Sequence, residues 1–196
     1  PPPFSSRRRH TRCGWLSRGL GDVYKRQALP VLLLAAPTPG TLLTGSILSF
    51  LGLCLRAFAA GSIHKEEALA VGGPYSLVRH PLYVGSFLVG TGLAWASGQW
   101  WLLLLFFGMF AWLYGTTISR EEAKLEGLFG DEYLDYRRRV PPLLPRIRGR
   151  PTGPDPEGTG VEGFRPWLYW RNKEWQAAAG TLAGYGLLLA RMWLWP

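Results

Sequence analysis

Polar and aromatic side chains crowd the start of an apolar segment near the middle of the chain. They are Tyr75, Arg79, His80, Pro81 and Tyr83. Proline suits the first turn of a helix, where its missing N–H removes no hydrogen bond, and helix N-termini attract negative groups. A membrane helix with interfacial Arg, His and Tyr would explain this run. A ligand-binding loop would explain it equally well, and a neighbouring group of charges favours the loop.

That second group is Arg120, Glu121 and Glu122, which follow a later apolar segment. If residues 81–96 and 100–118 form an antiparallel helical hairpin, the two groups lie at the same end and close together in space. Two carboxylates beside an arginine and a histidine are more than solubility requires. A solvated helix face is the alternative for these charges taken alone.

Tyr133 and Tyr136 add aromatic surface on the same side. Carboxylates and ring faces favour a positive centre, and an arginine or a helix N-terminus favours a carboxylate. A ligand with a positive centre, a negative group and a flat ring would use all of these partners. S-adenosylmethionine is such a ligand, although this chemical fit alone does not decide the matter.

Five apolar blocks must position these groups. They lie at 28–36, 42–60, 81–96, 100–118 and 175–195. A spanning helix needs about 20 apolar residues, so the first block is about half a span and reads as the tail of one. We predict an all-α, multi-pass transmembrane protein with about four to five spans. No stretch alternates as a half-buried strand would.

The parts between these blocks also carry predictions. Residues 81–118 should form the hairpin with its turn at 97–99, and residues 119–140 a cytoplasmic amphipathic helix broken at Gly130. Three arginines at 137–139 are expected to anchor anionic lipid headgroups. Arg56, near the end of the second block, is expected to reach the membrane interface. Residues 149–163 are rich in Gly and Pro and predict a flexible loop.

Lys and Arg are distributed unevenly between the segments that join the blocks. The turns at 37–41 and 97–99 have none, whereas residues 61–80 have two and residues 119–175 have eleven. Because positively charged loops stay in the cytoplasm, both polar segments, and with them the candidate site, are predicted to face it.

The net charge of +9 arises mainly at the start of the chain. Residues 1–27 hold seven Lys/Arg against one Asp, which accounts for +6. A nucleic-acid partner would rest almost wholly on this segment, and we expect none. The segment resembles a read-through translation of sequencing-adaptor DNA and is expected to be non-native, with a disordered basic arm as the alternative. Residues 28–196 are expected to form one membrane domain.

Two other patterns carry little chemistry. Cys13 and Cys54 support neither a disulfide framework nor a metal cluster, and no metal is expected. The glycines at 90 and 92 imitate part of a dinucleotide fingerprint, but no strand precedes them. Small residues for close helix packing are the better interpretation.

The two signature segments together resemble a known family. GGPYSLVRHPLYVGSFLVGTGLA followed by REEAKLEGLFGDEYLDYRRRVPPLLP is similar to the isoprenylcysteine carboxyl methyltransferase-like membrane enzymes, which are related to phospholipid N-methyltransferases. The likeness covers about residues 60–146. The tail FRPWLYWRNKEWQAAAGTLAGYGLLLA, with a last span at about 175–195, resembles a bacterial branch, which implies a bacterial inner membrane.

The resemblance implies a multi-pass helical enzyme that uses S-adenosylmethionine at the cytosolic face and takes its substrate from the lipid. It also implies which residues bind the cofactor: Tyr75, Val78, Arg79, His80, Pro81, Tyr83, Glu121, Glu122, Tyr133 and Tyr136. We assign catalytic roles to Glu121 and Arg120, with Arg120 orienting an acceptor carboxylate as a hypothesis from its charge and place. Such a carboxylate needs no general base, whereas an amine acceptor must be neutral or lose a proton.

Two other functions remain open. A sterol-reductase-like membrane enzyme using NADPH has a similar helical plan, but the paired acids Glu121 and Glu122 suit the negatively charged 2′-phosphate of NADPH poorly. A non-enzymatic membrane module would need the site residues only for folding. For the methyltransferase the expected partners are a lipophilic or lipid substrate and the membrane lipids. The sequence does not name the methyl acceptor.

Overall fold

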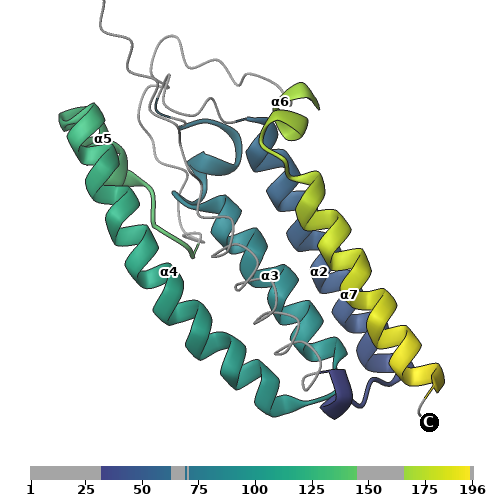
Figure 1. Ribbon diagram of the computed structural model, residues 1–196. Coiled ribbons are helices and arrows are strands. Elements are labelled where there is room, and N and C mark those ends of the chain that lie inside the picture. Colours follow the sequence, from purple (N-terminus) through teal and green to yellow (C-terminus); the bar gives the residue numbers. More distant parts are fainter. Residues whose placement is uncertain (1–31, 63–68, 70, 145–165, 195–196) are drawn as a thin grey trace, which may run out of the picture.

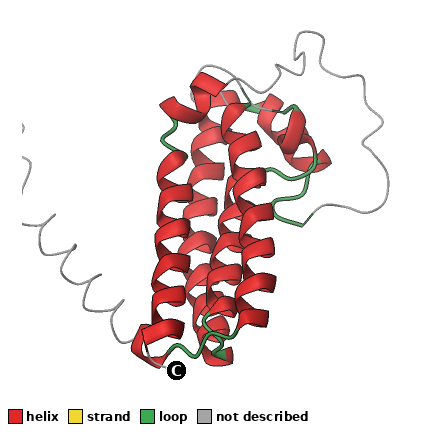
Figure 2. Cartoon of the chain, turned by 90° about the vertical axis from the view of Figure 1, so that its right-hand side faces the viewer, coloured by secondary structure: helices red, strands yellow, loops and turns green. Residues whose placement is uncertain are grey.

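The computed structural model describes residues 32–62, 69, 71–144 and 166–194 (Figure 1). Within these ranges the chain is helical, with no strand, as an all-α protein requires. The elements in chain order are α2 (Pro39–Gly61), the 3₁₀ helix η1 (Gly73–Ser76), α3 (Pro81–Ala96), α4 (Trp100–Phe129), α5 (Asp131–Arg139), α6 (Pro166–Arg171) and α7 (Trp175–Leu194). Figure 2 shows the long helices running side by side along one direction.

The beginning of α2 follows directly from its sequence. Thr38 is the N-cap, and its hydroxyl accepts from the backbone N–H of Thr41 at 3.2 Å. The Thr41 hydroxyl in turn accepts from the N–H of Thr38 at 3.0 Å. This reciprocal capping box, with Pro39 as the first helical residue, satisfies donors that the helix itself cannot. The helical residues 32–34 therefore end before a separate helix starts.

Glycines set the contact between α2 and α3. A Cβ atom on Gly45 would lie 2.5 Å from the carbonyl oxygen of Gly92, and one on Gly52 would lie 2.7 Å from that of Gly85. The two backbones touch at these two levels, which only residues without a side chain allow. Gly92, part of the apparent dinucleotide fingerprint, is thus a helix-packing residue, as the sequence indicated.

The hairpin of α3 and α4 has the predicted boundaries at Pro81, Ala96 and Trp100. Its turn at 97–99 contains Gly98 at φ 74°, in the left-handed region that glycine favours. The two helices are joined by aromatic pairs. The ring of Phe87 lies 5.0 Å from that of Phe110, centroid to centroid, in an edge-to-face contact.

The end of α4 differs from the prediction. Residues 119–129 do not start a new amphipathic helix but continue α4, which is 30 residues long. Gly130, at φ 53°, ends it as expected, and only the nine residues of α5 form a separate helix. No polar cap interrupts the chain at 118, so the apolar helix runs directly into the charged segment.

The C-terminal helix α7 lies beside α2 in Figure 1, with the short helix α6 at one end. The hydroxyl oxygens of Tyr185 on α7 and Ser49 on α2 are 2.9 Å apart and share a hydrogen bond. At the other end of the bundle, Leu188 joins Leu42 and Ala96 in one apolar cluster. These contacts attach the last helix to the α2–α3 pair.

Two helices, α2 and α4, are long and apolar enough to cross a membrane by length and composition. Helix α3 is apolar but has 16 residues. The count of four to five spans therefore stays a prediction. Residues 1–27, the first four residues of the block at 28–36 and the loop at 149–163 lie outside the described residues.

Candidate functional site

The binding loop predicted before α3 lies against the segment that follows α5. The backbone N–H of Arg79 donates to the carbonyl of Pro141 at 2.8 Å, and that of His80 donates to Pro142 at 3.1 Å. These prolines lack N–H groups but keep their carbonyls, so they end α5 and still bind the loop. Two segments that are 62 residues apart in the sequence thereby form one surface beside the first turn of α3.

Glu122 is the centre of the charged cluster. Its Oε1 atom lies 3.1 Å from Nη1 of Arg79 and accepts a 3.3 Å hydrogen bond from Nε2 of His80. Its Oε2 atom lies 3.8 Å from Nη2 of Arg137. The side chains of Arg79 and Glu122 are 8% and 12% exposed. This carboxylate is therefore partly desolvated and stabilised by three partners from two parts of the chain.

Glu121 binds the same helix end from its neighbouring position. The hydroxyl of Tyr83 donates to Glu121 Oε2 at 2.7 Å, and Nδ1 of His80 lies 3.9 Å from the same oxygen. The carboxylate of Glu121 is half exposed, at 47%. The two adjacent acids thus lie near the two ring nitrogens of His80, and of the two only Glu121 remains open to solvent.

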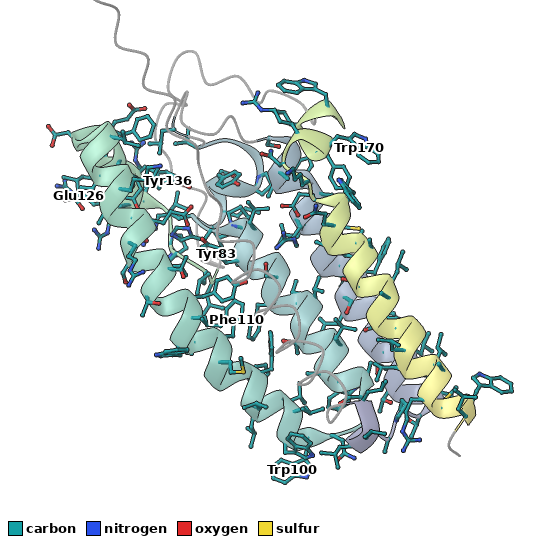
Figure 3. All side chains as sticks on the ribbon, viewed as in Figure 1. Tyr83, Trp100, Phe110, Glu126, Tyr136 and Trp170 are labelled. Atoms are coloured by element: carbon teal, nitrogen blue, oxygen red, sulfur yellow. The ribbon has the colours of Figure 1, made fainter. Side chains whose placement is uncertain are left out.

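Helix α5 covers the loop with two buried tyrosines. Tyr133 is fully buried, and Tyr136 donates its hydroxyl to the backbone carbonyl of Tyr75 at 2.7 Å. Leu69 and Val140 complete the apolar cluster around them. Figure 3 shows Tyr136 where α5 returns toward the loop, and Tyr83 and Phe110 between α3 and α4.

Several buried polar atoms of this region have no hydrogen-bond partner among the described residues. They are the hydroxyls of Tyr75 and Tyr133 and the atoms Nε and Nη1 of Arg79. Nη1 faces Glu122 as an ion pair but without hydrogen-bond geometry. Buried donors are nearly always satisfied in folded proteins, and an exception needs an explanation. A polar ligand beside η1 and α5 would satisfy these groups.

Burial also changes the ionisation of the site. It lowers the pKa of His80 below its ordinary value, although the hydrogen bond to Glu122 and the charge of Glu121 act in the opposite direction. His80 is therefore neutral near pH 7, and its Nε2–H is the donor to Glu122. Burial raises the pKa of Tyr75, so its hydroxyl keeps its proton and can donate.

The remaining predicted site residues have distinct places. Val78 and Pro81 are buried and support the loop rather than presenting polar atoms. Arg120 is exposed and makes no hydrogen bond or ion pair with any described residue. Successive helical residues are rotated by about 100°, so Arg120 points away from the side of α4 that carries Glu122. The structure therefore gathers both acids at the loop but does not bring Arg120 to them.

Two charged groups were missed by the sequence interpretation. Arg137, expected to anchor lipid, instead contacts Glu122 and lies 3.6 Å from Glu126. Arg56 forms an ion pair with Glu174 at 2.7 Å, and its reach to the membrane interface stays a prediction. Glu174 precedes the last helix by one residue, and no periodicity connects it to Arg56. Within the described ranges no group of acidic, His and Cys residues could hold a metal ion.

Comparison with known proteins bears on the same part of the chain. Residues 40–132 match the family model of phospholipid methyltransferase. The chain is 34% identical over 126 residues to protein-S-isoprenylcysteine O-methyltransferase from Schizosaccharomyces pombe, which covers 64% of this chain and 51% of that protein. The chain is thus similar to this methyltransferase family over residues 40–132, just under half of its length.

Other proteins to which the chain is similar carry different names. Methanethiol S-methyltransferase from Crocosphaera subtropica is 40% identical over 74 residues, 37% of this chain and 28% of that protein. Cobalt-zinc-cadmium resistance protein CzcN from Cupriavidus metallidurans is 36% identical over 83 residues, 42% of this chain and 38% of that protein. The chain spans about half the length of the first relative and less of these two. No solved structure matches.

The part matched to the methyltransferase family contains most of the site. It includes α2, the loop before α3, and α4 with both acids, whereas Tyr133 and Tyr136 follow it directly. The family and the apolar helices together identify a membrane protein. The family predicted from the two signature segments is thus confirmed. The individual roles of the site residues stay predictions.

Proposed function

We propose that this protein transfers a methyl group from S-adenosylmethionine to a lipophilic acceptor at the cytoplasmic face of the membrane. The observation that carries the proposal is the cluster of buried polar atoms without partners, next to two adjacent carboxylates. The methyltransferase family of residues 40–132 supports it. Named relatives that methylate an isoprenylcysteine or methanethiol support the reaction type.

The donor set fits this cofactor in charge and polarity. Glu121 presents a half-exposed carboxylate to a cationic group, and Nε of Arg79, which is buried without a hydrogen-bond partner, suits an anionic one. The hydroxyls of Tyr75 and Tyr133 offer two further donors from the apolar side. When bound, S-adenosylmethionine would supply a methyl group activated on a positively charged sulfur.

The protein's own contribution is positioning and exclusion of water. Glu122, fixed by Arg79 and His80, holds the loop against α4. Tyr83 connects the same loop to Glu121, and α5 covers it with Tyr133. These residues would orient both reactants for in-line displacement. Neutral His80 keeps a proton on Nε2, toward Glu122, and therefore does not compete for the methyl group with that nitrogen.

The acceptor is proposed to be a lipophilic carboxylate or amine that approaches through the membrane. Arg120 is exposed and lies outside the cluster of the two acids, so the role that we assign to it, orienting the acceptor's carboxylate, requires an acceptor that approaches along the outer side of α4. This role would be excluded if Arg120→Ala changed neither the transfer rate nor the affinity for the acceptor. The bacterial inner membrane and the cytoplasmic orientation of the site belong to the same proposal.

Binding measurements on detergent-purified protein test the function directly. Saturable binding of S-adenosylmethionine is expected in the wild type and should weaken at least about tenfold in Glu122→Gln, since a charged partner of the loop is lost. Glu126→Gln is the matched control, because Glu126 is half exposed and contacts only Arg137 among the described residues. Saturable NADPH binding without S-adenosylmethionine binding would overturn the proposal in favour of a reductase.

A transfer assay then distinguishes the acceptor classes. Methyl-labelled S-adenosylmethionine is incubated with a farnesylated cysteine analogue, a long-chain amine and a small thiol in separate reactions. Label in the first two supports a lipophilic carboxylate or amine. Label in the thiol alone would favour instead the chemistry in the name of the relative methanethiol S-methyltransferase.

A further inference from the structure

Arg56 on α2 is the hub of a second polar cluster. Its Nε and Nη2 atoms donate to Glu174 Oε2 at 2.9 and 2.7 Å. Its Nη1 atom donates to the hydroxyl of Ser86 and, at 3.5 Å, to the carbonyl of Leu82. The Glu174 side chain is 10% exposed and that of Arg56 is 21% exposed. A single guanidinium thereby connects α2, α3 and the corner between α6 and α7.

The chain makes room for this contact at some cost. A Cβ atom on Gly85 would lie 2.5 Å from Cγ of Arg56, so only glycine lets the arginine stem cross α3. At the corner, Lys173 has φ 57°, a conformation that non-glycine residues seldom adopt. Asn172 next to it donates to the carbonyl of Ala60 at 3.0 Å. The corner is thus fixed on the N-terminal side of Glu174.

On α3, Arg56 contacts the same first turns of the helix that carry His80 and Tyr83 of the candidate site. Leu82 and Ser86 lie about one turn apart on the same side of α3, and the Ser86 hydroxyl donates to the Leu82 carbonyl at 2.9 Å. Tyr83, one residue further, contacts Glu121, and His80 caps the helix. A shift of these turns relative to α2 would move both contacts with α4.

We propose that the Arg56–Glu174 ion pair is a positioning element for methyl transfer, which fixes the first turns of α3 and so holds His80 and Tyr83 against the paired acids. The corner that supplies Glu174 lies outside residues 40–132, the part matched to the family. The C-terminal segment therefore takes part in the site without contacting it. This inference rests on the proposed function, and one of its measurements is independent of that function.

The first measurement needs no ligand. Amide hydrogen exchange is followed over residues 82–86 in detergent for the wild type, Arg56→Met and Glu174→Gln. Protection of these amides should fall at least about tenfold in both variants, while α4 around Phe110 keeps its protection. Arg138→Met is the control, because Arg138 is 77% exposed and its pair with Asp135 is also exposed. Unchanged exchange at 82–86 in folded variants would overturn the inference.

The second measurement is affinity for S-adenosylmethionine. Each single variant should weaken binding about tenfold, and the double variant Arg56→Met/Glu174→Gln should weaken it no further, since the two residues act as one unit. A loss in the double variant equal to the product of the single losses would contradict this. A pair important only for folding would lower the melting temperature but leave the affinity of the folded protein unchanged.

The two measurements separate the inference from the proposed function. If the wild type fails to bind S-adenosylmethionine, the function fails, but altered exchange in the variants still supports the positioning of α3. If Arg56→Met does not fold, Ser86→Ala replaces it, because that change removes only the hydroxyl that Nη1 contacts. Normal binding with altered exchange would overturn the role in methyl transfer.

Discussion

The hydroxyl of Tyr83 donates a 2.7 Å hydrogen bond to Oε2 of Glu121, joining α3 to α4 across the hairpin. The ring of the same tyrosine lies 4.9 Å from that of Tyr114, centroid to centroid. The Tyr83 side chain therefore belongs both to the aromatic contacts between α3 and α4 and, through its hydroxyl, to the charged cluster at their end. Apolar packing between the helices and polar chemistry at their end are connected at this residue.

Tyr83→Phe should separate these two contributions. The ring contact is kept, whereas the hydrogen bond to the charged acceptor is lost. That loss should weaken the interaction between Tyr83 and Glu121 by about 1.5–3 kcal/mol, and by less than this to the extent that water screens the half-exposed Glu121. We expect S-adenosylmethionine to bind several-fold more weakly by calorimetry. Tyr114→Phe is the control, since that hydroxyl makes no hydrogen bond with a described residue. Equal effects of the two substitutions would refute the role of the Tyr83 hydroxyl.

Glu122→Gln should destabilise the fold itself. Arg79 is 8% exposed, and removal of its charged partner leaves a buried guanidinium without a close counter-ion. Breaking a buried pair in this way costs about 3–5 kcal/mol. Glu126→Gln should cost less than about 1 kcal/mol, because its pair with Arg137 is exposed. Chemical denaturation in detergent micelles compares the two variants, and similar losses would argue against a special role for Glu122.

Tyr133→Phe should stabilise the ligand-free protein while it weakens ligand binding. The Tyr133 hydroxyl is buried and meets no described residue in full hydrogen-bond geometry, although the Arg79 guanidinium lies close to it, and removing such a group relieves a cost of about 1–3 kcal/mol. Tyr136→Phe should do the opposite, because its hydroxyl donates to the carbonyl of Tyr75. Melting temperatures with and without S-adenosylmethionine measure both effects. A Tyr133→Phe protein that is less stable without ligand would show that its hydroxyl has a partner in the free protein.

Stability should fall as the pH drops below about 6.5, the ordinary pKa of histidine. Burial lowers the pKa of His80 in the folded state, so in this range the unfolded chain binds a proton that the folded chain does not. Glu121, Glu122 and Arg79 face the ring and are retained in the comparison variant His80→Gln. The stability advantage of the wild type over this variant should therefore decrease from pH 7 to 5.5. An advantage that grows on acidification would mean a raised pKa.

Gly45→Ala tests the contact between α2 and α3. The added methyl group would lie 2.5 Å from the backbone oxygen of Gly92, so the helices must separate, at about 1–3 kcal/mol. Gly108→Ala on α4 meets nothing within 4 Å and should stabilise its helix by up to about 1 kcal/mol. Thermal unfolding should move in opposite directions for the two proteins. A loss of stability in both would mean that α4 has a partner at Gly108.

The sequence predicted the elements of this fold better than their contacts. Proline and glycine mark the start of α3, the turn at 97–99 and the break at Gly130, because each acts on the local backbone. The hairpin likewise predicted that His80 and the paired acids would meet. The extension of α4 through residue 129 was missed, because a change from apolar to charged residues does not end a helix unless a breaker or a cap accompanies it.

The partners of single charges could not be predicted in this way. Arg56 and Glu174 are separated by 118 residues, and neither belongs to a periodic pattern. Arg137 looked the same as the two arginines after it, yet it contacts Glu122 because the turn at Gly130 directs α5 back toward the loop. Such pairs depend on how helices cross, which the local sequence does not contain.

The uninterrupted course of α4 has a consequence for how the protein can vary. From Trp100 to Glu121 no loop absorbs a change in length, so each inserted residue would move the acids by about 1.5 Å and rotate them by about 100°. A single insertion would turn them away from His80, while α3 would stay in place. Viable insertions or deletions in this hairpin must therefore come as whole turns in α3 and α4 together. Otherwise they must lie in the turn at 97–99 or beyond Phe129.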